Sequence, residues 1–187
     1  MENQLFNDKY RIESIRLKHW DYSSCGAYFI TICTKNRECC FGEIINGKMI
    51  LSGIGGIVSN EWQKTQQIRK NVELDEWVVM PNHFHGIVII NENINPVETC
   101  CGMSLPQKYN RFSKPISQSL SMIINHFKSA VTRQCHKIGF THFSWQPRFY
   151  EHIIRNEIEL NTIRNYIINN PTKWQFDRNN KSHNSHV

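Results

Sequence analysis

Two histidines, His83 and His85, are the residues with the clearest capacity for chemistry. They lie in the segment MPNHFHG at residues 80–86, directly before an apolar run at residues 87–90. Side chains two positions apart on a strand point to the same face, so the two imidazoles would project side by side from a rigid element. Such a pair can hold a divalent metal ion. Taken alone, a His-x-His pair on a strand is more often structural than metal-binding.

A second set of candidate residues lies on the last predicted helix. Leu160, Ile163 and Ile167 form an apolar stripe, and Tyr166 lies beside that stripe. Asn170 follows four residues after Tyr166, so both side chains project from the same side of the helix. Tyrosine is an uncommon covalent nucleophile that can attack a phosphate. An amide oxygen is a hard ligand that suits Mg²⁺ or Mn²⁺.

Together these residues describe a phosphoryl-transfer site. A metal ion held by His83, His85 and Asn170 would polarise the scissile phosphate and orient the leaving 3′-oxygen, while Tyr166 would attack in line. Most of the rate gain would come from positioning and charge stabilisation. The spacing alone does not bring Tyr166 to the histidines. A helical tyrosine beside an apolar stripe is also commonly a core or interface residue.

The composition is that of a globular protein with a basic surface. The chain has 187 residues, 40% of them apolar and 20% charged, which suits one domain with a real core. Its formal net charge of +6 favours a polyanionic partner, most commonly nucleic acid. We expect a cytoplasmic protein without a membrane partner, because no apolar stretch has the length of a membrane span or of a signal-peptide core. The seven cysteines contain no C-x-x-C pair and are expected to be free thiols.

The elements that must position the candidate residues are predicted by periodicity and turn signals. The patterns predict strands at 28–34, 72–80, 83–90 and 145–154, a hairpin at 43–51, and helices at 52–67, from 120 to Gly139, and from the Asn156 N-cap to Pro171. This order predicts an α+β fold with an antiparallel sheet covered by helices on one side, on a split βαβ or ferredoxin-like plan. The strand of His83 and His85 would lie inside the sheet.

The chain divides into three predicted parts. Residues 1–27 are polar and basic and are expected to be an arm. Residues 28–174 would form a single domain, with a long mobile loop at 91–116 that lacks periodicity. The polar residues 175–187 are expected to be a disordered tail.

Longer motifs resemble those of a known family. The segment MPNHFHG looks like the HUH motif (His, bulky apolar, His) of single-tyrosine transposases. The segment WQPRFYEH at 145–152, continued by IIRN, resembles a signature of the REP-associated tyrosine transposases. So does YIINNP at 166–171, followed by Lys173. The resemblance covers roughly residues 28–174, and the combination of motifs is far more specific than the His-x-His pair.

This resemblance implies a function and a set of site residues. His83 and His85 would be ligands of Mg²⁺ or Mn²⁺, Asn170 would complete the metal site, and Tyr166 would form a 5′-phosphotyrosine bond and free a 3′-OH. The fold would be an RNA-recognition-motif-like sheet with the HUH strand inside it and the tyrosine on the C-terminal helix. The substrate would be single-stranded DNA beside an imperfect hairpin, as in repetitive extragenic palindromes, bound by a monomer or a homodimer. Tyr150 lies in a signature but has no asparagine four residues later.

Basic residues outside the metal site are candidates for contacts with DNA. They are Arg11, Arg16, Lys18, Lys128, Arg133, Arg148 and His152. Two alternatives to a strand transferase stay open. One is a DNA-hairpin-binding protein that performs no strand transfer, and the other is a metal-dependent phosphodiesterase that uses water as its nucleophile. The intact set of one tyrosine, one asparagine and two histidines favours the transferase.

Overall fold

The computed structural model describes residues 25–91 and 119–180. Three predictions fall wholly or mainly outside these residues: the basic arm with Arg11, Arg16 and Lys18, the long loop at 91–116, and residues 181–187 of the tail. Within the described part of the chain, no helix has the length and apolar character that a membrane crossing requires.

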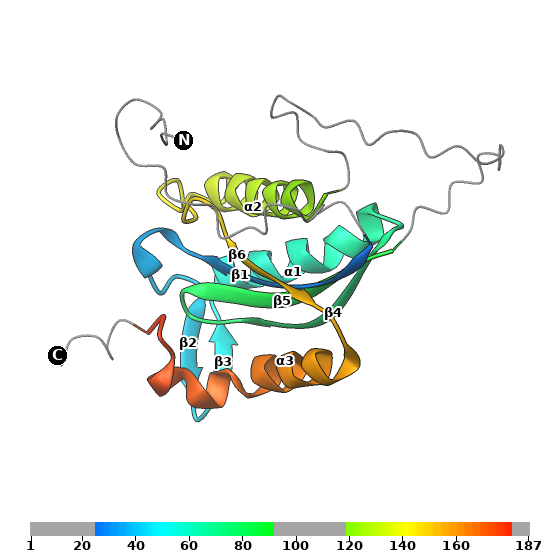
Figure 1. Ribbon diagram of the computed structural model, residues 1–187. Helices are drawn as coiled ribbons and strands as arrows, with labels where there is room; N and C mark the ends of the chain where they lie inside the picture. Colours follow the sequence, from blue (N-terminus) through cyan, green and yellow to red (C-terminus); the bar gives the residue numbers. More distant parts are fainter. Residues whose placement is uncertain (1–24, 92–118, 181–187) are drawn as a thin grey trace, which may run out of the picture.

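A four-stranded antiparallel sheet in the order β4-β5-β1-β6 forms the centre of the fold (Figure 1). Its strands are β1 (Gly26–Cys33), β4 (Val72–Val79), β5 (His83–Ile90) and β6 (Tyr150–Ile154). β1 and β5 are the inner strands, and their register places Thr31 opposite His85. The predicted α+β class and ferredoxin-like plan are confirmed, and the strand that carries both histidines lies inside the sheet, as expected.

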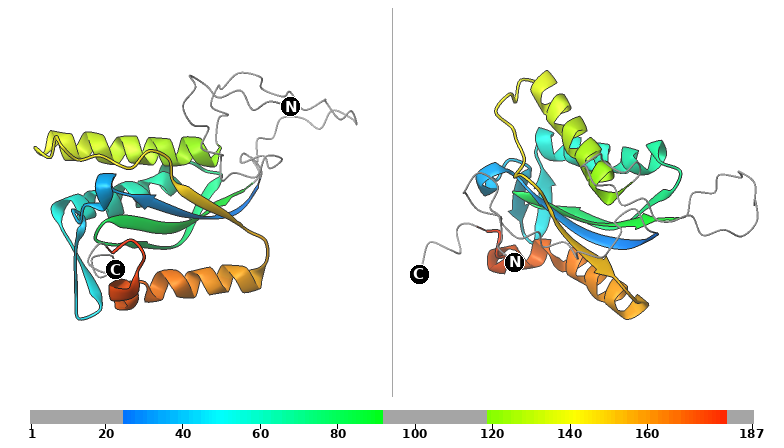
Figure 2. Two further views of the ribbon diagram at one scale, coloured as in Figure 1. Left: turned by 60° about the vertical axis from the view of Figure 1, so that its left-hand side comes forward. Right: turned by 45° about the horizontal axis from the view of Figure 1, so that its top comes forward.

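The helices cover both faces of the sheet, whereas the sequence predicted helices on one side. Helices α1 (Gly53–Ile68) and α2 (Leu120–Lys137) lie on one face, and α3 (Glu157–Asn169) lies on the other (Figures 1 and 2). The inner strands explain the difference, because both of their faces are apolar. Tyr28 and Phe84 belong to the core cluster under α1 and α2. Phe29 and Ile87 belong to a second cluster with Ile167 of α3.

Local signals of the sequence produce the predicted hairpin and caps. Asn46 and Gly47 both have left-handed backbones, with φ of 51° and 72°, and they join β2 (Gly42–Ile45) to β3 (Lys48–Leu51). This hairpin is a separate two-stranded sheet. The side chain of Ser52 caps α1 and that of Asn156 caps α3, each by accepting a hydrogen bond from a backbone N–H of the first turn. Two short 3₁₀ helices complete the described elements, η2 (Lys35–Arg37) and η3 (Pro171–Phe176).

Two predicted boundaries need correction. The strand predicted from residue 145 begins only at Tyr150, because Pro147 cannot donate to a ladder and Arg148 has a left-handed backbone with φ of 65°. The tail predicted to be disordered from residue 175 is wrong for residues 175–180. Asn179 and Asn180 are buried there. The backbone carbonyl of Asn179 accepts a hydrogen bond from Asn82, and the side-chain amide of Asn180 donates to the carbonyl of Trp174.

Gly86 is the one position of the MPNHFHG segment where a side chain does not fit. A Cβ at this position would lie 2.9 Å from ring atoms of both Trp62 and Phe84, which are fully buried. We expect Gly86→Ala to lower the free energy of unfolding by about 1–3 kcal/mol through overpacking, measured by urea denaturation. The matched control is Gly56→Ala in α1, where an added Cβ meets nothing within 4 Å. It should be neutral or stabilising by up to about 1 kcal/mol. Equal losses in both variants would contradict this account.

Candidate functional site

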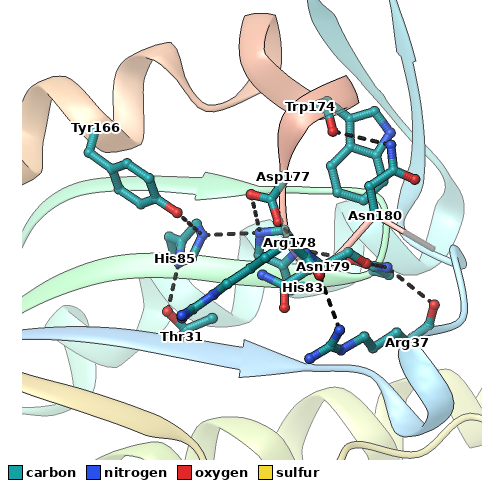
Figure 3. Close-up of polar contacts among 11 residues, drawn as sticks. Thr31, Arg37, His83, His85, Tyr166, Trp174, Asp177, Arg178, Asn179 and Asn180 are labelled. Atoms are coloured by element: carbon teal, nitrogen blue, oxygen red, sulfur yellow. Dashed lines mark hydrogen bonds and ion pairs between the residues drawn. The ribbon is translucent and has the colours of Figure 1, made fainter. Parts of the chain in front are cut away.

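The two histidines of β5 lie side by side on the sheet face that α3 covers. His83 is fully buried and His85 is 1% exposed. Their Nε2 atoms are 3.0 Å apart, so the two rings converge on one point (Figure 3). The two side chains thus lie on the same face of the strand, as their spacing predicted.

Asn82 determines which nitrogen of His83 carries the hydrogen. The amide nitrogen of Asn82 donates to the carbonyls of Arg37, at 3.2 Å, and Asn179, at 2.8 Å. The amide oxygen is thereby turned toward His83 and accepts from Nδ1 at 2.8 Å. The Nε2 atom of His83 is then left with a free lone pair, which is the state that a metal ligand needs.

His85 has a partner of the same kind on β1. The hydroxyl of Thr31 lies 2.8 Å from its Nδ1. When that nitrogen donates to Thr31, the lone pairs of both Nε2 atoms face each other, and a cation between them would satisfy both. Burial, the main cause, lowers the pKa of His83 to about 3 and the pKa of His85 well below its usual value. Both imidazoles are therefore neutral at pH 7 and able to act as ligands.

Asp177 is the functional candidate that sequence reasoning missed. One of its carboxylate oxygens lies 3.9 Å from Nε2 of His83. The ligand atoms of His83, His85 and Asp177 all lie within 4.8 Å of one another. The sequence held no signal for this contact, because Asp177 lies in an aperiodic polar segment that was predicted to be disordered.

The segment 177–180 is fastened to the domain at several points, and this holds Asp177 in place. The carboxylate of Asp177 accepts from the backbone N–H of Asn179 at 2.6 Å. The carbonyl of Asn179 accepts from Asn82, and the carbonyl of Arg178 accepts from Arg37 at 3.2 Å. Figure 3 shows Asp177, Arg178 and Asn179 of this segment beside His83. Asn82 thus orients both His83 and the segment that supplies the carboxylate.

Tyr166 reaches the histidine pair from α3. Its hydroxyl lies 3.3 Å from Nε2 of His85, and its ring stands edge-on to Phe29 with a centroid separation of 6.0 Å. The side chain is 45% exposed, so a bound substrate can approach it. Burial and the charge of Asp177 raise the pKa of the Tyr166 phenol, and a hydrogen bond from Asn170 acts in the opposite direction. The phenol is therefore protonated at neutral pH.

Asn170 ends α3 and begins η3. Its side chain is 3% exposed, and its amide oxygen is buried without a hydrogen-bond partner among the described residues. A buried acceptor without a partner is costly unless something outside the protein satisfies it. Because Asn170 also hydrogen-bonds Tyr166, the orphan oxygen belongs to the same site.

An ion pair docks α3 onto the sheet. Arg164 donates from Nε to Asp75 Oδ1 at 2.9 Å and from Nη2 to Oδ2 at 2.5 Å, which is a two-pronged contact between α3 and β4. Ile167, one residue beyond Tyr166, is fully buried against the sheet. These two contacts fix the rotation of α3, and they turn Tyr166 toward His85.

The donor set fits a divalent cation. Two neutral imidazoles and one carboxylate converge, and a buried amide oxygen nearby lacks a partner among the described residues. Nitrogen and oxygen donors of this kind suit Mn²⁺ or Mg²⁺, and imidazoles also accept zinc. The phenol of Tyr166, at hydrogen-bond distance from His85, adds a group of the kind that attacks a phosphate in phosphoryl transfer.

The predicted DNA contacts fall into different places. Lys128 donates from its ammonium group to the carbonyls of Gln146, at 2.7 Å, and Arg148, at 3.1 Å, so two of its three N–H donors are used within the domain. His152 is paired with Glu159 of α3 at 2.6 Å. Arg133 is exposed on α2, across the sheet from the histidines. Arg148 is exposed in a groove beside Thr31, and of these four residues it lies best for a contact near the site.

Comparison with known proteins identifies the class to which this arrangement belongs. No protein-family model matches the chain. An uncharacterized protein of Haemophilus influenzae is 43% identical over 166 residues, which cover 88% of this chain and 91% of that protein. The REP-associated tyrosine transposase of Escherichia coli is 29% identical over 152 residues, 81% of this chain and 70% of the relative.

A solved structure of a REP-associated tyrosine transposase bound to a REP hairpin shares the fold. It has a TM-score of 0.55 and 23% sequence identity, with 91% of this chain and 76% of that chain covered. Together with this shared fold, the sequence match to the Escherichia coli transposase supports a transposase-like protein of the DNA-processing kind. The chain is similar in sequence to a REP-associated tyrosine transposase and shares its fold with another, in agreement with the resemblance that its sequence motifs carry.

Proposed function

We propose that this protein is a metal-dependent single-stranded DNA endonuclease and strand transferase, which forms a 5′-phosphotyrosine intermediate next to DNA hairpins. The observation that carries the proposal is the 3.3 Å contact between the hydroxyl of Tyr166 and Nε2 of His85. This contact joins a nucleophile to a cluster of metal-ligand side chains. The two residues are 81 positions apart in sequence, so the fold itself must bring them together.

His83, His85 and Asp177 are the residues that would hold the cation, and the unpartnered oxygen of Asn170 supports a fourth ligand. A bound Mg²⁺ or Mn²⁺ would polarise the scissile phosphate and stabilise charge on the leaving oxygen. Asn82 and Thr31 would orient the two imidazoles through the hydrogen bonds to their Nδ1 atoms.

Tyr166 is the proposed nucleophile. A bond forms between its phenolic oxygen and phosphorus, and the bond between phosphorus and the 3′-oxygen breaks. The electron pair goes to the 3′-oxygen, which gains a proton and becomes a free 3′-OH, while the phenolic proton is released. The aryl phosphodiester conserves the energy of the broken bond. A later attack by a 3′-OH can therefore reseal the strand and free Tyr166.

DNA with hairpins is the proposed partner. A relative of the same fold was solved with a REP hairpin bound, and a net charge of +6 favours a polyanion. Single-stranded DNA suits this chemistry. Its backbone is more accessible than that of a duplex to a tyrosine on a helix packed against a sheet.

A labelling experiment tests the proposal. The whole protein is mixed with Mn²⁺ and with end-labelled single strands of both senses from the DNA that flanks its gene, and the products are separated on a denaturing gel. We expect a label that migrates with the protein and disappears with a chelator. Cleavage without attachment would indicate hydrolysis by water. Retarded bands on a native gel, with neither cleavage nor attachment across a broad set of hairpins, would indicate a hairpin-binding protein without transferase activity.

Asn82 offers a prediction on the orientation of the ligands. Asn82→Ala removes the acceptor for Nδ1 of His83, the bond that fastens the carbonyl of Asn179 in the segment 177–180, and the bond to the carbonyl of Arg37. We expect the affinity for Mn²⁺ to fall by about 10- to 100-fold, measured by calorimetric titration. Asn60→Ala, which removes an exposed amide from α1, serves as the control. A loss of thermal stability with unchanged Mn²⁺ affinity would argue against an orienting role.

A further inference from the structure

A groove lies near the histidine pair at the edge of the sheet, and none of the steps proposed above involves it. It has a volume of about 750 Å³. Its walls come from the ends of β1 and β6, from α2, and from the segments at 37 and 178–179. We call it the edge groove, and it is lined by Thr31, Cys33, Arg37, Ser121, Asn125, Gln146, Pro147, Arg148, Phe149, Tyr150, Glu151, Arg178 and Asn179.

The groove exists because the segment at 147–149, directly before β6, lies away from β1 and is not paired with it. Pairing between β1 and β6 stops at Thr31 and Tyr150. The two segments are joined again at 33–35, where the backbone N–H of Gln146 donates to Cys33 at 2.9 Å, Trp145 bridges Thr34, and the N–H of Lys35 donates to Ser144. Lys128 of α2 braces the segment at 147–149 from behind by binding the carbonyls of Gln146 and Arg148. The position of this wall is therefore fixed by hydrogen bonds from a partly buried lysine.

The lining carries the charge and the rings that a single-stranded nucleic acid requires. Arg37, Arg148 and Arg178 supply three guanidinium groups, against the one carboxylate of Glu151. The ring of Tyr150 is 38% exposed, and the guanidinium of Arg178 lies 6.0 Å from its centre. Guanidinium groups bind phosphates, and exposed aromatic rings stack on bases without strong sequence preference. The cavity is of small-ligand size, so it suits a nucleotide rather than a duplex.

The groove and the proposed nucleophile lie on different sides of His85. Tyr166 contacts Nε2 of that ring, whereas Thr31, which lines the groove, contacts Nδ1 (Figure 3). Phe29 contacts both tyrosines, with its ring centre 6.0 Å from that of Tyr166 and 6.3 Å from that of Tyr150. In an in-line displacement the leaving oxygen departs on the side opposite the nucleophile. The strand that ends in the leaving 3′-oxygen is therefore directed toward the groove.

From this geometry we propose that the edge groove binds the nucleotide on the 5′ side of the scissile phosphate. Its base stacks on Tyr150, and its phosphate lies among Arg37, Arg148 and Arg178. The inference rests on the proposed function, because it takes Tyr166 as the attacking group. The groove would keep the cleaved strand bound by its last nucleotide, so that the 3′-OH remains beside the phosphotyrosine for resealing.

Binding without cleavage tests the inference. The full chain with Tyr166→Phe is titrated into 5′-fluorescein-labelled hexathymidylate, and fluorescence anisotropy is followed. Adding Tyr150→Leu should weaken binding about tenfold or more, because one stacked base is lost. Adding Tyr150→Phe instead keeps the ring and should restore the affinity. Equal affinities for the leucine and phenylalanine variants would overturn the inference.

A second variant tests the charge of the groove. Arg148→Asn removes the guanidinium, and asparagine tolerates the left-handed backbone at this position. It should weaken binding and reduce the slope of log affinity against log salt by about one. The control is Lys137→Asn at the far end of α2, about 18 Å along the helix from Asn125 of the groove. The same loss in both variants would mean nonspecific attraction and would overturn the assignment.

Crosslinking tests the direction of the strand. The Tyr166→Phe protein is irradiated with tetrathymidylates that carry 5-iodouracil at the 3′ end or at the 5′ end. We expect the 3′-terminal base to crosslink to Tyr150, as identified by peptide mass, and the opposite preference would overturn the proposed direction. Neither the titration nor the crosslink needs cleavage. A wild-type protein that forms no phosphotyrosine would count against the proposed function alone. DNA affinity that is unchanged by substitution of Tyr150 and Arg148 would count against this inference alone.

Discussion

Tyr166→Phe should abolish the covalent protein–DNA product while the protein stays folded. The phenol oxygen is the only group lost, and the ring keeps its edge-on contact with Phe29. Because the hydroxyl is the proposed nucleophile, we expect adduct formation to fall by about 10³-fold or more, measured as labelled DNA that migrates with the protein on a denaturing gel. Binding of hairpin DNA should persist, because the side chain is 45% exposed and its hydroxyl contributes little to folding.

Tyr150 supplies the critical comparison for this prediction. It is the other exposed tyrosine near the site, with its ring 6.3 Å from Phe29, and it lies within the signature segment at 145–152. Tyr150→Phe should still form the adduct, and peptide mapping of the wild-type product should locate the DNA on Tyr166. Cleavage that survives Tyr166→Phe but not Tyr150→Phe would reverse the assignment of the nucleophile.

Asp177→Asn should cause the second largest effect, a loss of metal binding. The amide keeps an oxygen for the backbone N–H of Asn179, so the segment 177–180 stays fastened. It removes the only negative charge among the three clustered donors. We expect the affinity for Mn²⁺ to fall by at least about 100-fold, since even the loss of an outer partner of a ligand costs 10- to 100-fold. Calorimetric titration of the whole chain measures the change, and the rise in melting temperature on adding Mn²⁺ should shrink with it.

Glu43→Gln provides the matched control for the change in charge. Glu43 is exposed on β2, and its substitution removes one negative charge outside the donor cluster.

A loss of Mn²⁺ affinity in Asn170→Ala combined with normal affinity in Asp177→Asn would identify Asn170, rather than Asp177, as the third ligand. That outcome would return the site to the set of ligands that the sequence motif predicts.

The predictable parts of this fold are those that depend on neighbours in sequence. Runs of β-branched and aromatic residues predicted the inner strands, Asn46-Gly47 predicted a hairpin, and Ser52 and Asn156 predicted helix starts, because each signal acts within a few residues. The side-by-side arrangement of His83 and His85 has the same local origin. The family motif then implied a link to Tyr166 that no local pattern carries.

The unpredicted parts depend on contacts between distant segments. Asp177 reaches the cluster because Asn82 and Arg37 hold its segment, and neither contact has a periodic signature. Lys128 was predicted to contact DNA because it is basic, but its ammonium group donates to two backbone carbonyls. Only the path of the chain at 146–148 brings those carbonyls to it. The position of α3 on the second face likewise follows from the apolar side chains of both faces of β1 and β5.

The order in which the site's parts occur along the chain has a consequence for protein synthesis. Thr31 and Arg37 come first, His83 and His85 follow, and Tyr166 and Asp177 are added near the end of the domain. A ribosome therefore delivers the scaffold and the imidazoles well before the proposed nucleophile and the carboxylate. A product of premature termination before Tyr166 would hold both histidines but have nothing with which to open a DNA strand. Under the proposed mechanism, interrupted translation would therefore yield a product that does not cleave DNA, without any separate inhibitor.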